Sequence, residues 1–167
     1  MTFKEIFDCF LDKKKHLKVV YVASCNKKWK PNSAAKMLVD IVAPNEVLFL
    51  DYKFTQTYSN LKEIPQASLS FMDDVEFRGF RLTGLCTIMD SGEEYERTQK
   101  LWERKLISYE ADRIIQRTKG LYSARDAENN LPDDFFIVKF TALEAAAIKP
   151  GRVFKANRSF EFLPKLP

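Results

Sequence analysis

Few of the signals that mark common catalytic and metal-binding classes occur in this sequence of 167 residues. The three cysteines are widely spaced, and the single histidine, His16, belongs to no Cys/His/Asp cluster with metal-ligand spacing. Neither Gly-x-Ser-x-Gly nor Gly-x-Gly-x-x-Gly is present. We therefore predict no metal site, no nucleophile-elbow hydrolase and no Rossmann dinucleotide fold.

A strong charge of one sign is also missing, since 27 basic residues face 23 acidic ones and the net charge is only +4. Duplex-binding modules usually carry a more one-sided charge, which argues against nucleic acid as a partner and fits a small anionic ligand better. The cysteines are three in number and widely spaced, so they do not suggest a set of disulfide bonds. No run of 18 apolar residues occurs. We therefore expect a cytoplasmic protein with no membrane partner.

The first half of the chain has the pattern of a helix followed by strands in quick succession. Apolar residues recur at helical spacing in TFKEIFDCFLDKKK near the N-terminus. Five strand-like runs follow: they are Val19–Cys25, Ser33–Val42, Val47–Asp51, Ala67–Met72 and Phe80–Met89. Strands at this spacing with tight links predict an antiparallel sheet closed into a small barrel.

In the second half of the chain, the spacing of the apolar residues changes from that of strands to that of a helix. Charged and apolar residues alternate at helical spacing from Glu93 to Thr118, which predicts a long helix or a helical pair. A further strand is expected at Phe135–Thr141, a short helical turn at LEAAA (Leu143–Ala147), and an apolar tail from about 149 to 167 that docks on the barrel or on a partner subunit. The prediction for 1–167 is thus one domain with a helical insertion at about 93–118.

The segment FTQTYSNLKEIP, from Phe54 to Pro65, has more polar chemistry than a plain connector between strands needs. Thr55 and Thr57 precede a short helical pattern that must end near Ile64, because a residue before proline avoids the α region. A helix N-terminus offers unpaired N–H groups and positive partial charge, so hydroxyls beside it can form a phosphate seat. The commoner role of such a threonine is only to cap the helix. Spacing alone leaves both roles open.

Sequence order adds a resemblance. Six segments follow one another between about Leu17 and Asp90: they are a KPN turn, the strand AAKMLVD, the strand LFLD, the segment T-x-T-Y-x-N-L-K-E-x-P, the strand ASLSF and the strand RGFRLTG. This order resembles the pyridoxamine 5'-phosphate oxidase-like family of FMN-binding split barrels. The resemblance implies an α+β protein with an antiparallel six-stranded split β-barrel, homodimeric, with FMN at the subunit interface. The tail RSFEFLPKLP lacks the Arg-x-His signature of the oxidases proper, so pyridoxamine phosphate oxidation is not expected.

The resemblance also implies a set of flavin contacts. The second strand would flank the isoalloxazine ring and the ribityl chain, the threonine segment would take the phosphate, Asn60 would hold the turn, and Arg81 or Arg78 would come from the neighbouring strand. The implied cofactor-binding residues are Lys36, Met37, Leu38, Val39, Asp51, Thr55, Gln56, Thr57, Asn60 and Arg81.

The phosphate segment departs from the oxidases in its charge. Gln56 and Thr57 stand where the oxidases carry basic side chains. The charge that balances a phosphate must then come from Lys36, Lys53, Lys62 or an arginine across the dimer. Weak phosphate binding is one consequence of this departure.

Three functions are compatible with the sequence. The first is an FMN-dependent oxidoreductase that passes hydride between a nicotinamide donor and a small acceptor, with the redox chemistry supplied by the flavin. The second is a binding protein without turnover that holds flavin, haem or another anionic planar ligand. The third is a small nucleic-acid-binding barrel that uses NKKWK and KPGRVFKANR, with bases stacked on Trp29 and Phe154.

Overall fold

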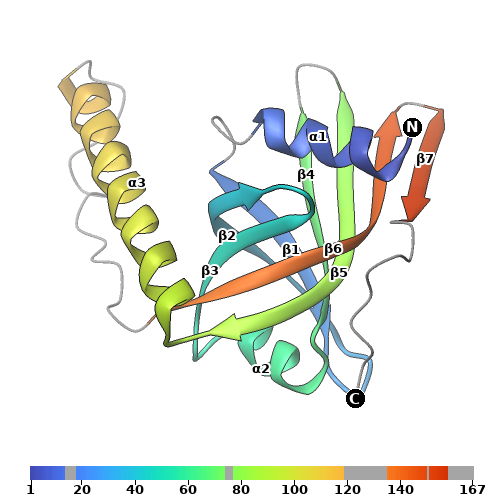
Figure 1. Cartoon of the computed structure of the whole chain (residues 1–167), viewed down its shortest axis with the longest axis horizontal. Coiled ribbons are helices and arrows are strands. Elements are labelled where there is room, and N and C mark those ends of the chain that lie inside the picture. Colours follow the sequence, from blue (N-terminus) through green and yellow to red (C-terminus); the bar gives the residue numbers. More distant parts are fainter. Residues whose placement is uncertain (14–17, 74–76, 119–134, 150, 158–167) are drawn as a thin grey trace.

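The structure is a computed structural model that describes residues 1–13, 18–73, 77–118, 135–149 and 151–157. In these ranges the chain forms a β-barrel with helices at its ends and along one side (Figure 1). The elements are α1 Phe3–Lys13, β1 Val19–Cys25, β2 Pro31–Val42, β3 Glu46–Tyr52, α2 Gln56–Glu63, β4 Gln66–Asp73, β5 Arg78–Met89, α3 Glu93–Thr118, β6 Phe135–Lys149 and β7 Arg152–Asn157.

The barrel is closed by strands that are distant in the sequence. Its strand order is β3-β2-β1-β4-β5-β6, and β3 pairs with β6 from Glu46↔Thr141 to Tyr52↔Phe135. Every one of these pairings is antiparallel. The predicted six-stranded antiparallel split barrel of the α+β class is therefore confirmed, with β7 added to β6 outside the closed ring.

The helical turn predicted at Leu143–Ala147 is wrong, because these residues continue strand β6. Ala145 pairs with Leu82 of β5 on one side and with Ala156 of β7 on the other. Alanine has the highest intrinsic helix propensity, but that preference is small in energy, and two neighbouring strands that satisfy the backbone outweigh it. Strand β7, which lies in the predicted tail, thus explains why this alanine-rich segment is extended.

Helices close the two ends of the barrel. Helix α1 lies across one end, and α2 lies at the opposite end (Figure 1). Ile6, Phe7 and Phe10 of α1 are buried in the main core, where the Phe10 ring packs edge-on against Phe71 at 4.5 Å between centroids. Their i, i+1 and i+4 positions place one apolar helix face on the barrel, as the sequence pattern predicts.

Helix α3 packs on the outside of the barrel and then extends away from it (Figure 1). Trp102 is buried in a second cluster with outward-facing residues of β2, β3 and β6, among them Val39 and Leu50. The Tyr109 ring lies edge-on to Trp102 at 6.3 Å between centroids. Trp102 is therefore a core residue of the protomer. The helices of the described ranges all lack the combination of length and apolar character needed to cross a membrane.

Candidate functional site

Helix α2 begins and ends where the sequence chemistry predicts. Thr55 is its N-cap, with an extended backbone at φ −82° and ψ 153°, and its hydroxyl accepts a hydrogen bond from the Tyr58 N–H at 3.1 Å. Ile64 ends the helix in an extended conformation, as a residue before Pro65 must. The capping role of Thr55 is thus confirmed, and its hydroxyl oxygen is already engaged as an acceptor.

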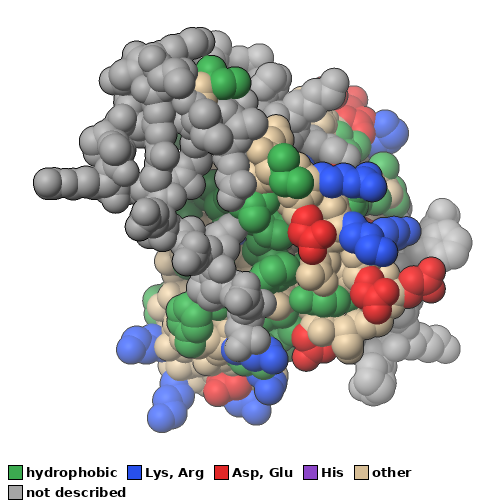
Figure 2. Space-filling model, turned by 90° about the vertical axis from the view of Figure 1, so that its left-hand side faces the viewer, with side chains coloured by type: hydrophobic (Ala, Val, Ile, Leu, Met, Phe, Trp, Pro, Cys, Tyr) green, Lys and Arg blue, Asp and Glu red, His purple; other side chains and the backbone are tan. Residues whose placement is uncertain are grey.

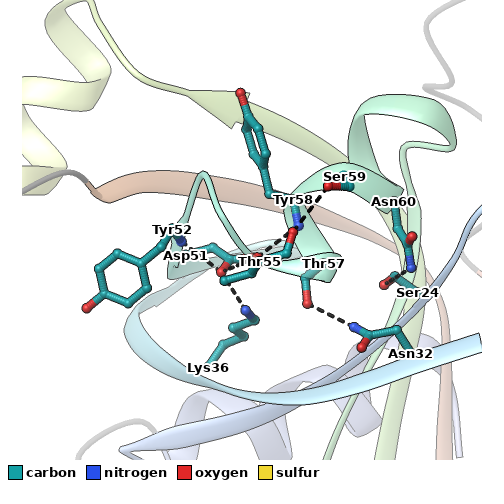
Figure 3. A network of polar contacts seen from close by, with 10 residues as sticks. All are labelled: Ser24, Asn32, Lys36, Asp51, Tyr52, Thr55, Thr57, Tyr58, Ser59 and Asn60. Atoms are coloured by element: carbon teal, nitrogen blue, oxygen red, sulfur yellow. Dashed lines mark hydrogen bonds and ion pairs between the residues drawn. The ribbon is translucent and has the colours of Figure 1, made fainter. Parts of the chain in front are cut away.

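A buried ion pair lies directly beneath this N-terminus. Asp51 Oδ1 accepts hydrogen bonds from Lys36 Nζ at 2.5 Å, from the Tyr52 N–H at 2.8 Å and from the Thr55 hydroxyl at 2.9 Å (Figure 3). Asp51 is 1% exposed and Lys36 is 8% exposed. Both side chains point into the end of the barrel, because each alternates with core residues along its strand. Three of the predicted site residues therefore form one connected network.

This network changes the role expected for Lys36. Its ammonium group faces the Asp51 carboxylate and the pair is sealed from solvent, so the positive charge is compensated within the protein. A phosphate outside the barrel would meet a neutral pair. Lys36 thus prevents the Asp51 carboxylate from repelling an anion at the α2 N-terminus.

Polar side chains of α2 tie the helix to the neighbouring strands. The buried Thr57 hydroxyl accepts from Asn32 Nδ2 at 3.1 Å, and Asn60 Nδ2 donates to Ser24 Oγ at 3.1 Å (Figure 3). Gln56 Nε2 donates to Asn60 Oδ1 at 2.7 Å. Asn60 therefore joins α2 to β1 in addition to closing its own turn. Ser24 and Asn32 were not predicted as site residues, although the KPN motif pointed to Asn32.

The remaining predicted residues separate into two surroundings. Leu38 faces the main core, whereas Met37 and Val39 face outward and pack in the cluster around Trp102. Arg81 is exposed on β5, where its paired neighbours are Ser70 and Ala146. Two strands separate β5 from β2 in either direction around the barrel. The structure thus does not bring Arg81 to the Lys36–Asp51 network within one protomer.

Charges near the helix differ in how they are engaged. Lys62 Nζ lies 5.4 Å from the centroid of the Tyr58 ring, a cation–π geometry. Lys53 is exposed in the turn that leads from β3 to α2. The Tyr52 phenol has its pKa raised above the usual value by burial and, to a lesser degree, by the Asp51 charge. A phosphate at the first turn of α2 would therefore find Lys53 as the nearest exposed cation along the chain.

Thiol and metal chemistry receive no support from the described residues. Cys86 is buried in the main core, and burial raises the pKa of its thiol to about 12. Such a thiol is almost wholly protonated at neutral pH and is a poor nucleophile. Within the described ranges, no group of three His, Cys, Asp or Glu side chains lies close enough to hold a metal ion. His16 lies outside these ranges.

Comparison with known proteins identifies a family. The family model described as pyridoxamine 5'-phosphate oxidase matches residues 7–147. No curated protein matches the chain. The match spans the barrel from α1 to β6 and includes both α2 and the Lys36–Asp51 pair.

Solved structures with the same fold come from several bacteria. A Clostridium acetobutylicum protein related to general stress protein 26 of B. subtilis has a TM-score of 0.65 at 18% identity, covering 92% of this chain and 95% of that one. A pyridoxamine 5'-phosphate oxidase-related, FMN-binding protein of Nostoc punctiforme scores 0.60 at 12% identity, with coverages of 96% and 93%. A haem-binding protein of Mycobacterium smegmatis scores 0.62 at 12% identity, covering 94% of this chain and 58% of that one. At these identities the likeness concerns the fold.

Proposed function

Because the chain belongs to the pyridoxamine 5'-phosphate oxidase family, we propose that it is an FMN-binding flavoprotein that passes hydride from a nicotinamide donor to a small acceptor. The observation that carries this proposal is the first turn of α2, where a helix N-terminus with neutral polar side chains lies above a charge-compensated ion pair. The related Nostoc punctiforme protein, described as FMN binding, supports the choice of ligand.

The residues at this turn fit a phosphate through neutral donors. The first N–H groups of a helix have no acceptor within the helix, and in α2 these belong to Gln56 and Thr57. The Thr57 hydroxyl accepts from Asn32 and keeps its own proton to donate. Lys36 neutralises Asp51, and the exposed Lys53 adds a positive charge nearby. The expected contribution of charge to FMN affinity is therefore smaller than in a site lined by basic side chains.

A flavin at this position would supply the hydride chemistry, and the protein would bind and orient it. The backbone of β2 beside Met37 is the proposed wall for the ring, because it starts next to the phosphate position and runs along the outside of the barrel. Gln56 and Thr57 would hold the phosphate at the end of this wall. The hydrogen bonds of Asn60 and Asn32 would keep α2 in a fixed position relative to β1 and β2.

A homodimer is part of the proposal. Three exposed apolar side chains, Met72, Ile148 and Val153, lie in one row across the outer face of the sheet, with Gly79 between them. A row of this kind on neighbouring strands is a good candidate for a subunit contact. A partner subunit would also supply a second wall for the ring and could bring an arginine such as Arg81 to the phosphate.

The test is a titration with FMN. We expect saturable quenching of FMN fluorescence and a flavin absorption band that stays with the protein on gel filtration. Thr57→Val should weaken FMN binding about tenfold, as the loss of a hydrogen bond to a charged group predicts. Thr87→Val, an exposed threonine of β5, is the matched control and should leave binding unchanged.

Two outcomes would overturn the proposal. Absence of saturable FMN binding would remove the flavin function altogether. Equal FMN affinity in Thr57→Val and the unaltered protein would place the flavin elsewhere. Oxidation of NADH or NADPH by the FMN-loaded protein, measured at 340 nm with and without an added acceptor dye, then tests the oxidoreductase step.

A second candidate is a binding protein without turnover for haem or a similar anionic planar ligand. The neutral donor set at Gln56 and Thr57 favours this candidate, because it offers a phosphate no basic side chain of its own. The haem-binding protein of M. smegmatis shows that this fold accommodates haem in a relative. A haem titration followed at the Soret band, alongside the FMN titration, distinguishes the two ligands.

A further inference from the structure

The turn between β1 and β2 presents an exposed tryptophan on a strained backbone. Trp29 is 79% exposed and has a φ of 59°. This left-handed region suits glycine, and a bulky residue is rarely found there. An exposed indole gains little from burial at this position, so the core gives no reason for its choice. Strained positions of this kind concentrate at functional sites.

Hydrogen bonds hold the turn in one conformation. Asn26 Oδ1 accepts from the N–H groups of Lys28 at 2.9 Å and Lys30 at 3.0 Å, and the Asn26 carbonyl accepts from the Trp29 N–H at 2.9 Å. The Lys27 N–H donates to Glu63 Oε2 at the end of α2, at 3.1 Å. The turn is thus closed on itself and fastened to the helix. The backbone that carries the indole is therefore fixed at the tip.

Positive charge surrounds this ring. Lys27, Lys28 and Lys30 flank Trp29 on both sides in the sequence, and all three are exposed. Lys and Arg side chains also gather at the lower end of the molecule in Figure 2, the end at which Figure 1 places α2. A second exposed aromatic, Phe54, follows β3 at this same end and stacks on Tyr52 at 5.5 Å between centroids.

We propose that this turn binds single-stranded nucleic acid, with a base stacked on Trp29 and the adjoining phosphates contacted by Lys27, Lys28 and Lys30. A fixed backbone beneath the indole lowers the entropy cost of stacking a base on it, and lysines on either side of the ring match the phosphates on either side of a base. A membrane anchor would use the same residue types but has no need of a strained, hydrogen-bonded backbone. The balanced charge of the whole chain argues against a duplex and leaves a local single-strand contact open.

The C-terminal segment does not share this role in the way the sequence suggested. Phe154 of β7 is half-buried and packs against the main core, so it does not offer a free ring face for a base. Residues 158–167 lie outside the described ranges. The proposal therefore rests on the Trp29 turn alone and does not depend on flavin binding.

The test uses the full chain and two labelled probes, a 12-nucleotide oligo-dT and a 12-nucleotide oligo-U, followed by fluorescence anisotropy at low salt. Trp29→Gly should weaken binding about 5- to 150-fold, the effect of losing one stacked base. Phe77→Gly is the matched control, because Phe77 is also exposed and has a φ of 49° but follows the acidic sequence DDVE. Both substitutions relieve strain, so neither should lower the melting temperature.

Further measurements make the outcome decisive. Three lysine contacts predict a slope of about −2 for the logarithm of the association constant against the logarithm of salt concentration. A triple variant that combines Lys27→Gln, Lys28→Gln and Lys30→Gln should bring that slope close to zero. No saturable binding of either oligonucleotide, equal weakening by Phe77→Gly, or binding to phosphatidylglycerol vesicles in place of the oligonucleotides would overturn the proposal. Comparison of the two probes then distinguishes RNA from DNA.

Discussion

The Lys36–Asp51 pair offers the sharpest test of how the α2 end of the barrel is held together. Asp51→Asn keeps an oxygen that can accept from the Tyr52 N–H and the Thr55 hydroxyl but removes the negative charge. Lys36, only 8% exposed, is then left with an uncompensated charge. Breaking a buried pair from one side costs about 3 to 5 kcal/mol. The substitution should therefore destabilise the protein far more than its near-isosteric shape suggests.

The assay is thermal and urea unfolding followed by circular dichroism. For a chain of this length, about 1 kcal/mol corresponds to a shift of about 2 to 4 °C, so Asp51→Asn should lower the melting temperature by about 6 to 20 °C. The partly exposed pair of Lys139 and Glu94 serves as the control, with side chains 24% and 41% exposed. Lys139→Met should cost only about 0 to 1 kcal/mol.

A double variant separates the destabilisation caused by one unpaired buried charge from the net contribution of the ion pair to the free energy of unfolding. Lys36→Met combined with Asp51→Asn removes both charges, and its stability should recover most of what Asp51→Asn loses. If Asp51→Asn costs no more than Lys139→Met, the pair is not a buried electrostatic element and the account of a neutralised α2 site is wrong. If the double variant is as unstable as Asp51→Asn, the loss comes from packing and the charge argument fails.

Three other predictions concern the barrel and the ligand. Gly84→Ala should destabilise the protein strongly in thermal unfolding, because a Cβ there would lie 2.0 Å from the Thr141 carbonyl oxygen. Gly79→Ala is the control and should change the stability little, because the nearest atom to a Cβ at that position is 3.6 Å away. Cys86 should resist alkylation at pH 8 until the protein unfolds, since its thiol has a pKa of about 12, and fast labelling of the native protein would contradict its burial. FMN should bind at least about tenfold tighter than riboflavin, the effect expected of the Thr57 hydrogen bond alone, but with little salt dependence, because the phosphate donors are neutral; a strongly salt-sensitive preference would disprove this.

The boundaries of α2 and the strands around it were predictable because local chemistry determines them. Pro65 ends the helix by a steric rule, and Thr55 begins it by capping. Period-two alternation marks β1, β4 and β5 without help from distant residues. The closed barrel follows from the number and spacing of such strands.

The ion pair at the end of the barrel was not predicted, although both of its members were selected. Lys36 and Asp51 were assigned as separate flavin contacts, because the resemblance gives positions and not side-chain directions. Alternation contained the missing information: Lys36 is two residues from the core residue Leu38, and Asp51 is two residues from the core residue Phe49. Two opposite charges that both point into a barrel must pair or be neutralised.

The alanine-rich end of β6 could not be predicted from local sequence. Its extended conformation depends on β7 beyond it and on Gly84, which leaves room for the Thr141 carbonyl. Strand β7 itself is short and mostly exposed, and its alternation is weak, since only Phe154 and Ala156 are half-buried. Features that depend on a distant glycine and on an edge strand leave no periodic signal in the segment that they shape.

Helix α2 links the two proposed binding regions mechanically. Its first turn carries Gln56 and Thr57, and its last residue, Glu63, holds the backbone of the Trp29 turn. Between them, Asn60 fixes the helix to β1. A helix of eight residues is too short to flex between its ends, so a ligand that restrains the first turn also restrains Glu63. Helix α2 therefore holds the two proposed binding regions at a fixed separation.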